Sequence, residues 1–178
     1  TNAAGLQDVI GIDQSMFVPS PAVWIEAQNT LGSVLLVPGL RLDYLGATKE
    51  WRLQPRLAVR WTVVPELIFK GGFGTYAQIP EGDEYNEGLG NPNIDSERGW
   101  HASAGAEYRF TKSLELDTSV FYKDFDRLVR RVDDPDIRVD NQGVGRAYGF
   151  ELLLRQNLTS RFFGWIAYTL QRSERRDA

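Results

Sequence analysis

The stretch WRLQPRLAVRW, residues 51–61, decides the fold, because polar and apolar side chains alternate along it almost without a fault. Trp51 and Trp61 stand at its two ends and share one parity with the apolar residues between them, whereas the arginines share the other. In a β-strand this period of two places each set on its own face. About ten residues tilted by about 40° rise roughly 26 Å, close to the ~25 Å apolar band of a membrane β-barrel, which aromatic girdles border. The stretch therefore predicts a strand with a tryptophan at each edge of a lipid-facing band.

Composition alone resembles that of an ordinary soluble domain. The chain has 178 residues, a net charge of −4, 42% apolar residues and no cysteine. No apolar run approaches the ~20 residues of a transmembrane helix, but barrel strands carry a weaker hydropathy signal. The absence of cysteine excludes disulfides and thiolate metal sites, and no basic stripe indicates a nucleic-acid partner. Residues 1–14 lack the basic and apolar segments of a signal peptide, so an exported protein would begin upstream of them.

Turn signals divide the chain into about eight strand-like stretches. These are residues 21–30, 33–45, 51–64, 67–78, 98–110, 113–126, 144–157 and 161–173. Short connections alternate with longer ones, the pattern of an up-and-down membrane barrel whose long loops are extracellular. Residues 77–97 and 127–143 are the predicted long extracellular loops, and residues 1–19 are predicted to be a further loop or a strand lead-in.

The same two-face pattern recurs on the other strands. An arginine facing lipid at the bilayer midplane costs ~2–4 kcal/mol, so the charged face is predicted to line a polar lumen. The predicted lumen-facing residues are Arg41, Arg52, Arg56, Arg60, Glu107, Arg109, Glu151 and Arg155. The predicted lipid-interface residues are Trp51, Trp61, Trp100, Tyr108, Phe110 and Tyr148. A soluble antiparallel sheet with one wet face also alternates, but it does not need aromatic residues at membrane spacing.

Three segments carry motifs that go beyond alternation. The first is QPRLAVRWTVVPELIFKGGFGTYAQIP. The second is GNPNIDSERGWHASAGAEYRF, with Asn91, Pro92, Ile94, Glu97, Glu107 and Tyr108, and the third is NQGVGRAYGFELLLR, with Asn141, Gly143, Tyr148, Gly149 and Glu151. In this order they resemble a barrel strand pair, a loop-to-strand signature and a further strand motif of the TonB-dependent outer-membrane receptors. The resemblance covers about residues 20–173.

The resemblance implies an all-β, antiparallel, up-and-down transmembrane β-barrel of ~22 strands around a plug. Residues 1–178 are then part of that one barrel domain, an internal to C-terminal part with about eight strands and without the plug. The implied function is energy-coupled uptake of a scarce small-molecule nutrient, such as a siderophore or another iron chelate, across the bacterial outer membrane. The implied partners are outer-membrane lipid, the rest of the barrel, the plug and a periplasmic TonB-type energy transducer that contacts parts outside this chain. The chain is expected to be neither an enzyme nor a cofactor-binding protein.

Two other functions remain open from the residues. One is a passive porin-like or small closed outer-membrane barrel. The other is a soluble β-sheet module for binding or adhesion. Full-length sequence upstream and solubility without detergent distinguish these from the receptor.

Candidate ligand-binding residues are predicted from their position in the long loops alone. They are Tyr76, Asp83, Glu84, Tyr85, Arg130 and Arg131. Acidic clusters in both loops offer oxygen donors for Ca²⁺, but neither has the spacing of a calcium-binding loop, so solvated loops are the preferred interpretation. These clusters are Glu81, Asp83, Glu84 and Glu87, and Asp133, Asp134 and Asp136. His101 and Ser103 lie about 7 Å apart on one strand face, too far for a nucleophile–base pair, and no catalytic or metal-binding residue is predicted.

Overall fold

A computed structural model describes residues 17–86, 90–133, 137–159 and 162–176. Glu87, Asp134 and Asp136 of the acidic clusters lie outside the described residues, as does most of the 1–19 lead-in.

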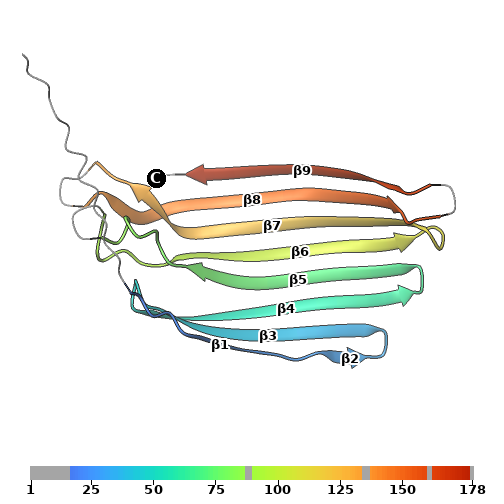
Figure 1. The fold of residues 1–178 in the computed structure, drawn as a ribbon, viewed down its shortest axis with the longest axis horizontal. Helices are drawn as coiled ribbons and strands as arrows, with labels where there is room; N and C mark the ends of the chain where they lie inside the picture. Colours follow the sequence, from blue (N-terminus) through green and yellow to red (C-terminus); the bar gives the residue numbers. More distant parts are fainter. Residues whose placement is uncertain (1–16, 87–89, 134–136, 160–161, 177–178) are drawn as a thin grey trace, which may run out of the picture.

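The described chain forms nine β-strands (Figure 1). They are β1 (Ala22–Glu26), β2 (Asn29–Leu31), β3 (Val34–Leu45), β4 (Glu50–Val64), β5 (Leu67–Gln78), β6 (Glu97–Arg109), β7 (Leu114–Arg131), β8 (Val139–Gln156) and β9 (Gly164–Arg176). Short turns join them at one end of the sheet, and the longer connections gather at the other end (Figure 1). We call these the short-turn end and the long-loop end.

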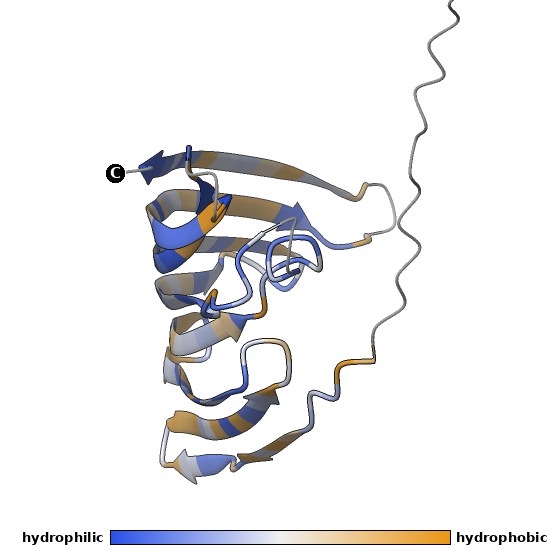
Figure 2. Ribbon diagram, turned by 90° about the vertical axis from the view of Figure 1, so that its left-hand side faces the viewer, coloured by the Kyte–Doolittle hydropathy of each residue, from blue (hydrophilic) through white to orange (hydrophobic). Residues whose placement is uncertain are grey.

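All strands belong to one antiparallel sheet in the order β1-β3-β4-β5-β6-β7-β8-β9, with β2 also paired to β3. From β3 to β9, consecutive strands therefore lie side by side, and the sheet forms a single curved layer (Figure 2). The all-β, antiparallel, up-and-down prediction is confirmed. Among the described residues, no helix has the length and apolar character needed to cross a membrane.

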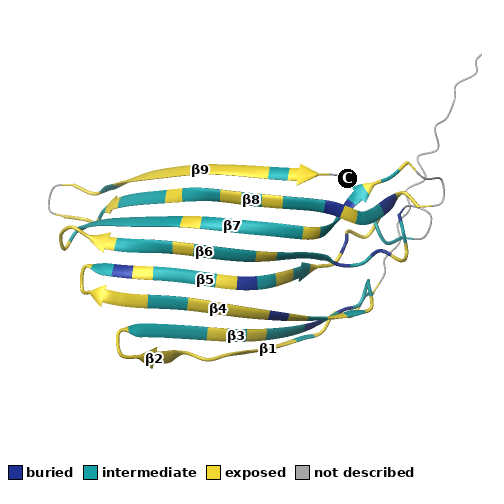
Figure 3. Ribbon diagram, turned by 180° about the vertical axis from the view of Figure 1, so that it is seen from behind, coloured by how far each residue is buried: buried dark blue, intermediate teal, exposed yellow. Residues whose placement is uncertain are grey.

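The register aligns the two side-chain sets into two continuous faces. Trp61 lies opposite Phe69 across β4 and β5, and Arg60 lies opposite Lys70. The apolar face is strongly exposed: Trp51 is 63% exposed and Leu53 is 60% exposed. Buried residues are few and lie mostly toward the long-loop end (Figure 3). A sheet whose large apolar side chains point away from any core needs an apolar environment on that face.

The predicted 21–30 strand is divided into β1 and β2 at Ala27 and Gln28. The register is continuous across the division, and the Ala27 N–H donates to the Pro38 carbonyl at 3.1 Å. Pro38 has no N–H to return a hydrogen bond, so the ladder is interrupted there.

The predicted 127–143 loop is shorter than expected. β7 continues to Arg131 and β8 begins at Val139, which leaves residues 132–138 as the connection. The register shifts between Phe125 and Leu128, and Arg127 has a positive φ of 57°. A β-bulge of this kind bends the strand that carries it. The β7–β8 hairpin nevertheless stays paired beyond the bulge, as far as Arg131 opposite Val139. By contrast, the 77–97 connection agrees closely with the observed end of β5 and start of β6.

β4 and β5 separate at the long-loop end. Their pairing extends only as far as Arg56 opposite Gly74, and Pro55 cannot donate a further backbone hydrogen bond. The side chain of Gln54, which is 5% exposed, spans the gap. Its Nε2 donates to the Asp43 carboxylate at 2.7 Å, and its Oε1 accepts from the Ala77 N–H at 3.2 Å. A side chain therefore replaces part of the missing ladder.

Candidate functional site

A cavity of about 860 Å³ opens at the long-loop end. Its walls are the first part of the β5–β6 connection, the tip of the β7–β8 hairpin and the end of β9. The lining residues are Glu81, Asp83, Glu84, Val129, Arg130, Arg131, Val132, Arg138, Val139 and Arg175. Segments far apart in the sequence thus share one hollow of the size that holds a small molecule.

The cavity has an acidic wall and a basic wall. Carboxylates come from residues 81–84, and guanidinium groups come from the end of β7, the β7–β8 connection and the end of β9. Arg130 is held in place, because it donates to the Asp140 carboxylate at 2.7 Å and to Gln142 at 2.8 Å. Arg131 and Arg138 are exposed. Such a cavity offers both donors and acceptors to a polar ligand.

The Glu84 carboxyl has a raised pKa. Partial burial is the main cause, and the negative charges of Glu97, Glu81 and Asp83 add to it. The Glu84 side chain also accepts a hydrogen bond from the Glu81 N–H at 2.7 Å, which fixes the turn. The Glu84 side chain therefore holds the 81–84 turn through a hydrogen bond, in addition to placing a carboxyl group in the cavity lining.

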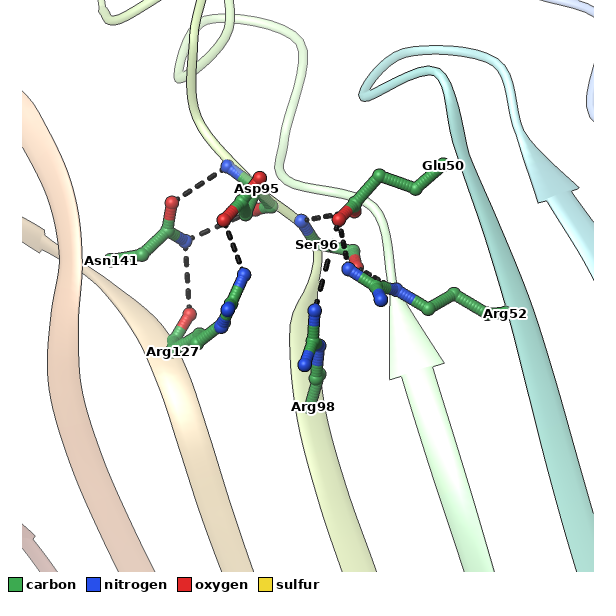
Figure 4. A network of polar contacts seen from close by, with 7 residues as sticks. All are labelled: Glu50, Arg52, Asp95, Ser96, Arg98, Arg127 and Asn141. Carbon is green, nitrogen blue, oxygen red and sulfur yellow. Dashed lines mark hydrogen bonds and ion pairs between the residues drawn. The ribbon is translucent and has the colours of Figure 1, made fainter.

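Residues 91–97, which we call the strap, form polar contacts with the sheet on both sides (Figure 4). On one side, Asn141 of β8 accepts from the Asp95 N–H at 2.7 Å and donates to the carbonyl oxygens of Asp95 and Arg127, both at 3.0 Å. The Arg127 guanidinium pairs with the Asp95 carboxylate. The positive φ at Arg127 thus occurs where the bulge presents this residue to the strap.

On its other side the strap binds β4. Ser96 is 0% exposed, and its N–H donates to the Glu50 carboxylate at 2.9 Å. Its hydroxyl accepts from the Arg52 Nε at 2.9 Å, and Arg52 also pairs with Glu50. The Arg98 guanidinium lies 3.9 Å from the same carboxylate (Figure 4). The strap therefore joins β4 to the β7–β8 hairpin across the separated ends of β4 and β5.

A small apolar core joins the strap, through Ile94, to the β7–β8 hairpin. Ile94, Val129 and Val139 are buried together, and Tyr85 packs against them. Asn91 donates to the Val139 carbonyl at 3.1 Å, and the Val129 N–H donates to Glu97 at 2.9 Å. The buried valines explain why β7 and β8 extend into the predicted loop.

The structure brings four of the six predicted ligand residues into the cavity. Asp83, Glu84, Arg130 and Arg131 line it. Tyr85 contributes to the apolar core instead. Tyr76 lies apart, with its ring 5.0 Å from the Arg56 guanidinium carbon. Sequence reasoning missed Arg138 and Arg175, which reach the cavity only through the β7–β8 connection and the end of β9.

The predicted lumen-facing residues share one face by register. Arg60 donates both ends of its guanidinium to Glu107, at 2.9 and 2.7 Å. Lys70 lies 3.2 Å from Glu107 and 2.6 Å from Asp117. A chain of opposite charges thus crosses β4, β5, β6 and β7. Arg41 pairs with Asp43 at 2.8 Å, and Arg155 pairs with Glu115.

The predicted interface aromatics lie on the opposite face. Rings contact one another near both ends of the strands, as in the 5.1 Å pair of Tyr44 and Trp51 and the 6.0 Å pair of Trp61 and Phe69. Phe110, just after β6, meets Tyr108 edge-on at 4.9 Å. Within the described ranges, no three His, Asp or Glu side chains are grouped to hold a metal ion.

Comparison with solved structures finds the same arrangement in outer-membrane receptors. The siderophore receptor PirA from Pseudomonas aeruginosa aligns with a TM-score of 0.73 and 21% identity, over 85% of this chain and 32% of that chain. The outer membrane transporter YddB from Escherichia coli aligns with a TM-score of 0.74 and 14% identity, over 88% and 24%. The ferric-catecholate import receptor Fiu from Escherichia coli K12 aligns with a TM-score of 0.71 and 14% identity, over 89% and 28%. These likenesses establish the fold, and this chain spans about a quarter to a third of each of those proteins.

No curated protein sequence matches the chain. The family described as TonB dependent receptor-like, beta-barrel matches residues 4–178. Proteins of this family are transport receptors of the bacterial outer membrane, not enzymes. The chain belongs to the TonB-dependent receptor-like β-barrel family.

Proposed function

We propose that this chain forms part of the barrel of a receptor that takes up a scarce nutrient, such as a siderophore or another iron chelate, by energy-coupled transport. The observation that carries the proposal is the cavity with opposed acidic and basic walls at the long-loop end of a receptor barrel. The solved relatives support an iron chelate as the substrate class, since their names include a siderophore receptor and a ferric-catecholate import receptor.

The orientation follows from the connections. Short turns face the periplasm and long loops face the outside in bacterial outer-membrane barrels. We therefore place the cavity at the extracellular mouth, where it would meet a substrate first. The apolar face is assigned to lipid and the charged face to the lumen.

The charged face suits contact with a plug. The Arg60–Glu107–Lys70–Asp117 chain is balanced in formal charge, and polar groups inside a barrel need partners. Residues of the plug would complete this network in the whole receptor. A periplasmic TonB-type transducer would supply the energy through parts of the receptor outside this chain.

Uptake by the full-length receptor tests the role of the basic wall. Cells that depend on the receptor would be given ⁵⁵Fe-loaded siderophores of catecholate, hydroxamate and carboxylate type. Arg131→Gln combined with Arg138→Gln is expected to raise the half-saturating concentration of the transported chelate at least about tenfold, because hydrogen bonds to charged groups contribute ~1.5–3 kcal/mol each. Arg109→Gln, at the short-turn end and away from the cavity, is the control. Unchanged uptake of every chelate by the double variant would refute the assignment.

The same assay separates active transport from the passive porin-like alternative. Uptake in a strain without the energy transducer should stop. Uptake that continues there, and that rises in proportion to substrate concentration, would identify a passive pore. Membership of an outer-membrane family already argues against the soluble adhesion module.

A further inference from the structure

The barrel wall opens between β4 and β5 at the long-loop end (Figure 1). Beyond the Arg56–Gly74 pair, residues 50–55 stay paired with β3 and residues 75–78 stay paired with β6, but the two segments do not pair with each other. We call the space between them the wedge. Unpaired strand edges are not left against hydrocarbon, so backbone in such a gap lies against protein or lines a cavity.

A hollow of about 510 Å³ lies at the wedge and is lined by residues of both faces of the sheet. Trp51, Leu53 and Trp100 belong to the apolar face by register, and Trp51 and Leu53 are strongly exposed there. Arg52 and Gln54 belong to the charged face. The hollow therefore combines an apolar outer part with a polar inner part.

Arg98 shows that the wedge connects the two faces. It shares the parity of Trp100 on β6, yet its guanidinium lies 3.9 Å from the carboxylate of Glu50, which shares the parity of the lumen-facing residues of β4. A side chain that starts on the outer parity thus reaches a group of the inner parity, across the space where β4 and β5 are separated.

Two buried polar atoms in the lining have no hydrogen-bond partner among the residues that the structure describes. They are the hydroxyl oxygen of Thr75 and the Nε of Arg98. Thr75 faces Trp100 in register, and Arg98 is the next residue of the same parity along β6. Buried polar groups in proteins are nearly always paired, so both atoms indicate a ligand that offers a hydrogen-bond acceptor.

The charges around the wedge favour an uncharged acceptor over an anion. The lining contains Arg52, Arg98, Asp124 and Asp126, and Glu50 lies beside both arginines. Two positive charges therefore meet three negative charges, and the site has no positive excess. The carbonyl oxygen of an amide or an ester accepts hydrogen bonds without adding charge.

We propose that the wedge binds the amide or ester group of a single-chain amphiphile, with its acyl chain on the apolar face and its polar part on the lumen side. The chain would lie beside Trp51, Leu53 and Trp100, and the carbonyl would accept from Thr75 or Arg98. The molecule thus passes through the wall where the sheet lacks its own hydrogen bonds. In the proposed uptake function, on which this step rests, the amphiphile is a chelate that carries an acyl chain.

Photolabelling of the full-length receptor in liposomes tests the wedge. The probe is N-dodecanoyl ethanolamine with a diazirine in the middle of its chain, and the reference probe is the same chain without the amide. The amide probe should label residues 51–55 and 75–77 at least about fivefold more than the rest of the apolar face, because the wedge adds hydrogen bonds to apolar contact. The reference probe should label the face evenly. Excess unlabelled N-dodecanoyl ethanolamine should remove the label from the wedge.

Thr75→Val combined with Arg98→Lys removes the hydroxyl and the Nε donor while keeping size and charge. It should raise the half-saturating concentration of the amide probe at least about fivefold, because two hydrogen bonds are lost. Thr118→Val combined with Arg109→Lys, in the continuous part of the sheet, is the matched control and should label like the native receptor.

Thr75→Trp fills the hollow and should abolish labelling of the wedge. Ala106→Trp, on the same face where β5, β6 and β7 are fully paired, is its control and should leave the labelling unchanged. Heat-modifiable migration shows that each variant is folded.

Equal labelling patterns from the two probes, or an unchanged half-saturating concentration in the Thr75→Val, Arg98→Lys variant, would overturn the proposal. Labelling needs no transport, so the two proposals fail separately. A receptor that is labelled in the wedge but takes up no chelate would contradict the proposed function alone. A receptor that takes up a chelate but is not labelled there would contradict the wedge site alone.

Discussion

Gln54 illustrates how one polar side chain completes a sheet where backbone pairing stops. It lies between Asp43 and the Ala77 N–H, at the point where Pro55 interrupts the β4–β5 ladder. Arg41 in turn binds Asp43 through both carboxylate oxygens, so a connected group of polar residues spans β3, β4 and β5. An unpaired buried group in this region would be costly, because little water reaches it.

Gln54→Leu keeps the size of the side chain and removes both hydrogen bonds. We expect it to lower the free energy of unfolding of the full-length receptor by about 1–3 kcal/mol, because the Ala77 N–H and the Asp43 carboxylate lose a buried partner. Urea unfolding of receptor refolded in liposomes measures this. Gln78→Leu, on an exposed residue of the neighbouring strand, is the control. Equal loss in the two variants would show that Gln54 does not bridge the strands.

Adjacent residues of β4 test the assignment of the two faces. Leu57 is 42% exposed on the apolar face, whereas Arg56 lies beneath the Tyr76 ring on the charged face. Leu57→Arg should cost about 2–4 kcal/mol of membrane stability, because it places a charge in hydrocarbon. Arg56→Leu should cost much less. Heat-modifiable migration of the full-length receptor in outer membranes reports assembly, and equal impairment would reverse the assignment of faces.

The strap converts a long connection into a defined structural element. Its contacts with β4 on one side and the β7–β8 hairpin on the other come from residues that carry the family-like motifs, notably Asn91, Ile94, Glu97 and Asn141. The strap thereby ties the β5–β6 connection to β4 and to the β7–β8 hairpin.

Asn141→Ala removes three hydrogen bonds to the strap and the bulge. We expect the amides of residues 95–97 to exchange with solvent at least about tenfold faster, because each lost bond removes ~0.5–1.5 kcal/mol of local stability. Hydrogen exchange followed by mass spectrometry measures the change. Asn93→Ala, whose side chain is exposed in the same strap, should leave the rate unaltered. Similar acceleration in both variants would argue against a specific role for Asn141.

Glu84 makes the packing of the acidic wall depend on pH. Because its pKa in the folded protein is raised, chiefly by burial, its contribution to stability is fully present below the ordinary value of 4.5 and is lost as the pH rises through the raised value. Amides of residues 81–84, corrected for intrinsic exchange rates, should therefore be better protected in mild acid than at neutral pH. Glu84→Gln should flatten this dependence. A variant with the native pH profile would assign the effect to another group.

The whole sheet has two open edges, at β1 and β9. Unpaired N–H and C=O groups on an edge strand cost several kcal/mol each in hydrocarbon, so spanning sheets are closed into barrels. The exposed apolar face adds a large surface that is unfavourable in water. The described residues alone neither pair the outer sides of the two edge strands nor cover the exposed apolar face.

Residues 1–178 expressed alone should therefore fail to insert as a stable monomer. We expect no heat-modifiable band and no protease-resistant fragment when this piece is mixed with liposomes, because its edges stay unpaired. The same segment within the full-length receptor is the control and should be protected. A protected monomer of the piece would instead support the small closed barrel that the residues alone left open.

Local patterns in the sequence predicted most of the fold. The parity of Trp51, Leu57 and Trp61 identifies the apolar face of β4 without knowledge of any other strand, since alternation depends only on the geometry of one extended chain. The break between β1 and β2 was missed, because it depends on Pro38 of the neighbouring strand, which cannot donate to Ala27. The end of β7 was missed, because the Val129–Val139–Ile94 core that stabilises it needs residues from another loop.

The candidate site depended far more on long-range pairing. Turn signals placed Asp83, Glu84, Arg130 and Arg131 in two expected loops, and the sheet order brings residues 81–84 and the end of β7 to one cavity. Tyr85 resembled a ligand-binding residue by position, yet it packs into the apolar core. Arg175 gave no local signal, because only the return of β9 to the long-loop end places it beside the cavity.

The sequence by itself therefore determined which side chains share a face, because the two-residue repeat of an extended strand is a local property. Only the tertiary structure decided which charges meet, since partners such as Arg60 and Glu107 are 47 residues apart and the β4–β5 and β5–β6 registers together set their contact. The cavity, the strap and the charge chain all belong to this second class, because each requires several strands to be aligned at once.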